Sequence, residues 1–144
     1  MLRTLSTAAI LLMVIACAQP PDPWPVDPSA IADPARMVVE PPTAIAGDEV
    51  KLHFPEGGDR GVLFALDAPS GGTWERRAYL LSDANGGEPT AHGAGEEMIV
   101  EMVGIAGPGP DTVVLPSAIA PGAYRICTAN AAQNLCAPIT IEDR

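Results

Sequence analysis

The strongest fold signal lies in two neighbouring segments, Gly122-Ala123-Tyr124-Arg125-Ile126-Cys127-Thr128 and Cys136-Ala137-Pro138-Ile139-Thr140-Ile141. Side chains alternate between the two faces of a β-strand, so Tyr124 and Ile126 share one face of the first segment. Ile139 and Ile141 share the corresponding face of the second segment. The pattern predicts an antiparallel hairpin with these four side chains turned inward.

The two cysteines of this hairpin fall on the opposite, outward face and predict a disulfide. Pairing Cys127 with Cys136 also places Tyr124 opposite Ile139, so the bridge and the hydrophobic pattern demand the same register. The closed loop has about ten residues, which in the chain-entropy model stabilises the fold by about 2.5–3 kcal/mol. Two free thiols are the alternative, and export to an oxidising compartment argues against it.

Outward from the hairpin, short apolar runs alternate with Gly, Pro, Asp and Asn from Met37 onward, with no sustained helical period. This pattern predicts an all-β fold, an immunoglobulin-like antiparallel β-sandwich of about seven to eight strands over residues 37–144. Val50, Leu52 and Phe54 are expected to face inward, and residues 62–66 are apolar on both faces, which predicts a central strand. The expected strands are 37–40, 49–54, 61–67, 74–81, 98–103, 112–115, 122–128 and 136–141.

The N-terminus has the features of a bacterial lipoprotein signal peptide. Arg3 supplies a cationic start, residues 8–14 an apolar run and Ala16 a small residue before the cut. We expect residues 1–16 to be removed and Cys17 to be lipidated, which would anchor the protein to the extracytoplasmic side of the bacterial cell membrane. The apolar run is shorter than the roughly 20 residues of a membrane span. Cleavage elsewhere, with Cys17 an ordinary residue, is the alternative.

Residues 17–36 interleave six prolines with acidic residues, which disfavours helix and strand hydrogen bonding. We expect a disordered, lipid-anchored, proline-rich linker. At about 3.1 Å per residue it would hold the domain up to roughly 50 Å from the membrane.

Charge restricts the partners. The formal net charge is −10, and removal of the signal peptide takes away only the cation Arg3. This acidity argues against nucleic acid and against anionic lipid headgroups.

Several motifs carry a resemblance to a known group. They are Leu115-Pro116, the run from Ala120 to Asn130 and Cys136-Ala137, together with residues 39–41, 46–48 and 60–64. In these motifs the chain resembles uncharacterised immunoglobulin-like lipoproteins and secreted proteins of actinobacteria. The resemblance implies an immunoglobulin-like fold and an extracytoplasmic location, and it assigns no catalytic residue.

Catalytic signals are weak. No Gly-x-Ser-x-Gly motif occurs, and Ser70, Ser82 and Ser117 lie in ordinary loop or strand-end contexts. We therefore expect that the protein is not an enzyme.

Metal-binding signals are also weak. His53 shares its strand face with Lys51, which predicts solvent exposure, and His92 lies in a Gly-rich segment expected to be a flexible loop. Both histidines with the thioethers of Met98 and Met102 would suit copper, but core packing explains the two methionines better.

Residues 83–88 resemble part of a calcium loop, although the same pattern is an ordinary hairpin turn. The acidic residues Glu96, Glu97 and Glu101 are expected to form a solvated strand edge. We therefore expect no metal and no cofactor.

Taken together, the sequence predicts a monomeric, membrane-anchored lipoprotein that binds another envelope component through loops or an open strand edge. Two alternatives remain: an envelope protein that binds copper or calcium, and a small hydrolase or the accessory subunit of an envelope enzyme.

Overall fold

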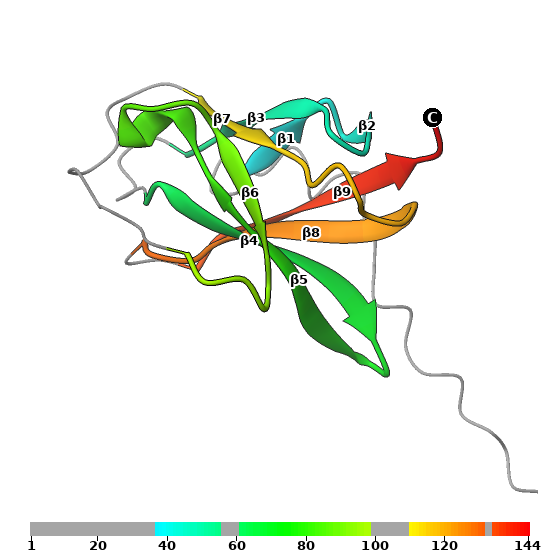
Figure 1. Ribbon diagram of the computed structural model, residues 1–144. Helices are drawn as coiled ribbons and strands as arrows, with labels where there is room; N and C mark the ends of the chain where they lie inside the picture. Colours follow the sequence, from blue (N-terminus) through cyan, green and yellow to red (C-terminus); the bar gives the residue numbers. More distant parts are fainter. Residues whose placement is uncertain (1–36, 56–60, 99–109, 132–133) are drawn as a thin grey trace, which may run out of the picture.

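The computed structural model describes residues 37–55, 61–98, 110–131 and 134–144. Within these ranges the chain forms strands in two sheets and a short 3-10 helix, so the all-β prediction is confirmed (Figure 1). The predicted signal peptide, Cys17 and the linker lie outside the described residues.

The two sheets differ in size. The three-stranded sheet has the order β1-β3-β7, with β1 at Val38–Glu40, β3 at Glu49–His53 and β7 at Asp111–Val114. The six-stranded sheet has the order β2-β9-β8-β4-β5-β6. Its strands are β2 at Thr43–Ile45, β4 at Leu63–Ser70, β5 at Thr73–Leu81, β6 at Thr90–Gly93, β8 at Gly122–Thr128 and β9 at Cys136–Glu142. Described pairings are antiparallel except that of β2 with β9, which is parallel.

Seven of the expected strands have counterparts, with ends shifted by at most three residues. Two edge strands, β2 and β6, were not predicted, because Thr43–Ile45 contains a single large apolar residue and Thr90–Gly93 contains none. The expected strand 98–103 lies outside the described residues except for Met98, which is not in a strand.

The register of the C-terminal hairpin is confirmed. Tyr124 pairs with Ile139 and Cys127 with Cys136, and the two sulfurs are bonded with the Cα atoms 4.1 Å apart. One expectation is wrong in detail. Cys127 lies on the sheet face away from the core, but its exposed fraction is only 4%. It pairs across the sheet with Ala65, which is fully buried, so the face is shielded at this pair of residues rather than solvated.

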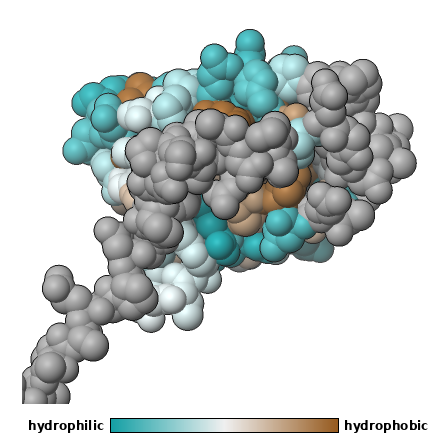
Figure 2. Space-filling view, turned by 180° about the vertical axis from the view of Figure 1, so that it is seen from behind, coloured by the Kyte–Doolittle hydropathy of each residue, from teal (hydrophilic) through white to brown (hydrophobic). Residues whose placement is uncertain are grey.

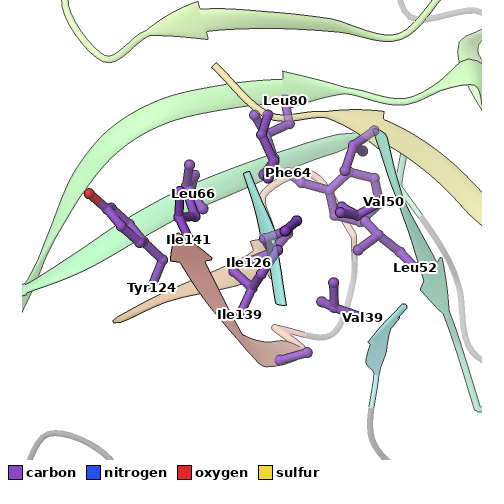
Figure 3. Packing of buried hydrophobic residues seen from close by; sticks show 14 of the residues in the cluster. Val39, Val50, Leu52, Phe64, Leu66, Leu80, Tyr124, Ile126, Ile139 and Ile141 are labelled. Carbon is purple, nitrogen blue, oxygen red and sulfur yellow. The ribbon is translucent and has the colours of Figure 1, made fainter. Parts of the chain in front are cut away.

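The core lies between the two sheets (Figure 3). The three-stranded sheet contributes Val39, Val50 and Leu52, which confirms the alternation expected for β3. The other sheet contributes Phe64, Leu66, Leu80, Tyr124, Ile126, Ile139 and Ile141. Phe54 is partly buried, with its ring centroid 5.9 Å from that of Phe64. Strand β4 lies between β8 and β5, so the central position expected for it is also confirmed.

Candidate functional site

The most distinctive side-chain arrangement lies on the outer face of the six-stranded sheet, the face turned away from the core. Five residues of β4, β5 and β8 gather there, and we call them the arginine–aromatic cluster: Asp67, Trp74, Arg76, Tyr79 and Arg125. Strands β5 and β8 flank β4, which is why residues so far apart in sequence meet (Figure 1).

Asp67 is the centre of the cluster. Its side chain is only 7% exposed, and its partners on the two neighbouring strands are Arg76 and Arg125. Arg76 Nε donates to Oδ1 at 3.2 Å, while Arg125 Nε and Nη2 donate to Oδ2 at 3.3 and 3.2 Å. A buried carboxylate without partners would be strongly destabilising, so Asp67 needs both arginines. The same charge-assisted hydrogen bonds fix the positions of the two guanidinium groups.

Each arginine also stacks on an aromatic ring. The Arg125 guanidinium carbon lies 4.3 Å from the centroid of the Trp74 ring, and that of Arg76 lies 4.8 Å from the centroid of Tyr79. Both distances are within the range of cation–π attraction. Arg76 Nη1 also donates to the Tyr79 hydroxyl at 3.0 Å. Burial by itself lowers the pKa of Arg76, but the hydrogen bonds to Tyr79 and Asp67 outweigh it and raise the pKa overall.

A β-bulge in β5 makes this arrangement possible. Leu66 pairs with Ala78, but the next residue, Asp67, pairs with Arg76, so Arg77 has no partner residue in β4. Directly paired residues share a sheet face, so the extra residue turns Arg76 and Trp74 to the outer face. Without it, Arg76 would share the inward face of Ala78. The bulge therefore assigns Arg76 to the cluster and Arg77 to the other side.

Arg77 lines an open cleft of about 840 Å³ on the core-facing side. Small residues of β4, β5 and β6 leave this space, namely Ala68, Ala78, Ala91 and Gly93, and the chain after β7 forms the opposite wall. Arg77 is already paired with Glu75, whose carboxylate lies 3.0 Å from Arg77 Nη2. Burial raises the pKa of Tyr124 at the edge of the cleft, and the charge of Arg77 partly opposes this increase.

The two histidines considered as possible metal ligands lie in different sheets. His53 lies on β3 of the smaller sheet, with Nε2 2.7 Å from an oxygen of Glu40, and His92 lies on β6 of the larger sheet. The expectation of a flexible loop around His92 is wrong, because His92 lies in β6 and pairs with Tyr79 of the neighbouring strand β5. The Nε2 atom of His92 lies 3.2 Å from Thr90 Oγ1. Among the described residues no group of three or more His, Cys, Asp or Glu could hold a metal ion. Met98 is half-buried, and Met102 lies outside the described residues.

The segment 83–88 lies in the connection of the antiparallel β5–β6 hairpin, but it contains a 3-10 helix rather than only a tight turn. Asp83–Asn85 forms the 3-10 helix, which ends at Gly86 with a φ of 91°. Asp83 Oδ1 accepts a hydrogen bond from the Thr112 amide at 2.7 Å, and Asn85 accepts one from the Gly87 amide. One oxygen of Asp83, which would be a ligand only under the calcium-loop alternative, is therefore used to join this helix to β7.

The remaining polar candidates lie at a strand end, in loops or in the interior. Glu96 is exposed and accepts a hydrogen bond from the Gly93 amide, Glu97 is exposed, and Glu101 lies outside the described residues. Ser82 is fully buried, and within the described part of the chain its hydroxyl has no hydrogen-bond partner. Ser70 ends β4 and Ser117 lines the cleft.

The surface and the comparisons give no further assignment. Seen from the side opposite to Figure 1, the molecule mixes hydrophilic surface with smaller hydrophobic areas (Figure 2). No helix in the described ranges is long and apolar enough to span a membrane. Comparisons with protein-family models, curated proteins and solved structures found no match.

The arginine–aromatic cluster was not predicted from the sequence. Its members were interpreted only as strand residues, although two local signals were present. Asp67 directly follows an apolar run, and Trp74, Arg76 and Arg77 crowd into the start of the next strand. A buried carboxylate requires cations nearby, but the sequence does not show which arginines reach it.

Proposed function

We propose that this protein is an extracytoplasmic lipoprotein, anchored through Cys17, whose immunoglobulin-like domain binds another envelope component through the arginine–aromatic cluster. The observation that carries the binding role is the cluster itself. Tryptophan, tyrosine and arginine dominate binding energy at protein interfaces, and rigidly held side chains lose little entropy on association. Here both guanidinium groups are held by one buried carboxylate on neighbouring strands.

The strand order supports the immunoglobulin-like assignment. The order β9-β8-β4-β5-β6 corresponds to G-F-C-C′-C″ of a variable-type domain, and β1-β3-β7 corresponds to A-B-E. The Tyr124 hydroxyl donates to the Ala120 carbonyl at 2.8 Å, as in the tyrosine corner of such domains. The disulfide differs. Cys127–Cys136 joins neighbouring strands of one sheet, and Ile126 stands two residues after Tyr124, where antibody domains have the inter-sheet cysteine.

The anchor is tested by Cys17→Ala. We expect loss of the protein from the membrane fraction or arrested processing, because the thiol of Cys17 is the acceptor of the lipid. Cell fractionation with mass spectrometry of the N-terminus measures both. Cys127→Ala with Cys136→Ala is the control and should leave the protein in the membrane fraction. A processed Cys17→Ala protein that still requires detergent for extraction would contradict the anchor.

The binding surface is tested by photo-cross-linking in intact cells. A photoreactive residue at Thr140, which is exposed on β9 beside the outer-face residues of β8, should give a discrete adduct. The adduct should disappear when Trp74→Ala is added. A photoreactive residue at Lys51, exposed on β3 of the smaller sheet, is the matched control. Equal adducts at both positions, or an adduct insensitive to Trp74→Ala, would contradict the proposed surface.

A further inference from the structure

The two arginines of the cluster keep hydrogen-bond donors beyond those that hold Asp67. A guanidinium carries five N–H groups. Arg76 uses Nε and Nη1 for Asp67 and Tyr79, and Arg125 uses Nε and Nη2 for Asp67. Within the described part of the chain, Arg76 Nη2 and Arg125 Nη1 donate no hydrogen bond, so both remain available to a ligand.

The accessible surface of these side chains agrees with this donor count. The side chain of Arg76 is 38% exposed and that of Arg125 is 27% exposed, whereas Asp67 is 7% exposed. The carboxylate is thus hidden below its two cations. A molecule approaching the outer face meets oriented N–H groups and the aromatic side chains, and it does not meet the acid.

The charge of the cluster and that of the whole chain together favour a short anionic ligand. The cluster contains two guanidinium cations and one carboxylate, so it has one excess positive charge on a chain of formal net charge −10. A long polyanion or an anionic membrane surface would be repelled by the rest of the molecule. A short acidic segment can place its carboxylates on the arginines alone, where forked N–H groups match carboxylate geometry.

We infer that the partner presents a short acidic peptide segment whose carboxylates bind Arg76 and Arg125 beside Trp74. This inference rests on the proposed binding function and adds the chemistry of the partner. The β-bulge at Arg77 is essential to it, because it turns Arg76 toward the partner and Arg77 away.

The test uses the full-length chain with Trp24→Phe, which leaves Trp74 as the single tryptophan. Titration with a capped tetraglutamate peptide should give a saturable change in Trp74 fluorescence. Capped tetraglutamine should give none, and affinity should fall as NaCl rises from about 50 to about 200 mM. Absence of saturable binding, or equal binding of tetraglutamine, would overturn the inference.

Two adjacent substitutions provide a matched pair. Arg76→Gln and Arg77→Gln each remove one positive charge, but the bulge places these side chains on opposite sides of the sheet. We expect Arg76→Gln to weaken tetraglutamate binding about fivefold or more and Arg77→Gln by less than about twofold. Equal weakening would show a general charge effect and overturn the inference. If Arg76→Gln does not fold, Arg76→Lys should keep the fold and still lose affinity, because it lacks the fork.

Two further measurements separate the chemistry from the binding function. Inorganic phosphate and phosphatidylglycerol vesicles should not compete with tetraglutamate at equal charge concentration, and strong competition by either would overturn the choice of a peptide carboxylate. A Trp74-dependent adduct at Thr140 without tetraglutamate binding would refute the acidic-segment inference and leave the proposed function standing. If the protein that keeps Trp74 gives no adduct at Thr140 but still binds tetraglutamate, the proposed function is refuted instead.

Discussion

The hairpins β8–β9 and β4–β5 belong to the same sheet, but their residues are assigned to its faces in different ways. In β8–β9 the pairing runs without interruption from Gly122 with Ile141 to Cys127 with Cys136. In β4–β5 the pairing shifts by one residue after Leu66. Strict alternation therefore predicts the faces of the first hairpin correctly, but it would assign the residues of β5 before the bulge to the wrong faces.

The two hairpins also differ in what their side chains contribute, which is core packing in β8–β9 and an exposed polar surface in part of β4–β5. The β8–β9 hairpin places Tyr124, Ile126, Ile139 and Ile141 in the core and carries a disulfide next to its connecting loop. The β4–β5 hairpin places half-exposed aromatic and cationic groups on the outer face. We therefore expect substitutions in the first hairpin to affect mainly the free energy of unfolding, and those in the second to affect mainly binding.

Tyr124→Ala should have the largest effect. It empties a site that is 6% exposed and removes the hydrogen bond to the Ala120 carbonyl, so we expect a loss of about 3 kcal/mol or more. Tyr124→Phe keeps the ring and should cost about 1 kcal/mol. Equilibrium unfolding in urea gives both values. A Tyr124→Ala protein as stable as the wild type would show that the inward face of β8 is wrongly assigned.

Removal of the disulfide comes next. Replacement of Cys127 and Cys136 by Ala should destabilise the domain by about 2–3 kcal/mol through the larger entropy of the unfolded chain. The sheet should persist because the disulfide is not part of the core cluster. Circular dichroism and urea unfolding of the double variant measure the two effects. Collapse of the fold would mean that the bridge, rather than the alternating pattern, sets the register of β8–β9.

Asp67→Asn tests the second hairpin. The amide group would turn donors toward Arg76 or Arg125, so we expect a loss of about 1–2 kcal/mol and release of both guanidinium groups from their present positions. Tetraglutamate binding should decrease even where the protein remains folded. Unchanged stability and unchanged binding in Asp67→Asn would argue that the arginines do not depend on this carboxylate.

Alkaline pH should have the smallest effect. Burial raises the pKa of Tyr124 in the folded protein above its value of about 10 in the unfolded chain. Ionisation of the phenol therefore favours unfolding, so its contribution to stability is complete below about pH 10 and is lost as the pH rises through the folded pKa. Urea unfolding at pH 9 and about pH 10.5 should show a decrease that is smaller in Tyr124→Phe. An equal decrease in both proteins would assign the effect to other groups.

Sequence reasoning worked where one local period was enough. The inward positions of Val50 and Leu52 and the register of β8–β9 follow from alternation and from the cysteine pair. The central position of β4 follows from apolar residues on both of its faces. Sequence reasoning failed for β2 and β6, which have at most one large apolar residue each, and for His92, which was interpreted as part of a loop although it lies in β6. In these cases the strand exists because a longer neighbour offers its hydrogen-bonding edge, namely the preceding strand β5 for β6 and the sequence-distant strand β9 for β2.

The all-β class, the apolar faces that form the core and the pairing of Cys127 with Cys136 could be predicted from the order of residues alone. These features depend on side-chain alternation, which involves only residues that are close together in the sequence. The burial of Asp67 between Arg76 and Arg125, and the positions of Arg76 and Arg77 on opposite sides of the sheet, depend on how the strands pair in the folded domain. The physical reason is that a bulge is an adjustment between two strands, and the burial of a carboxylate depends on cations supplied by both neighbours of its own strand.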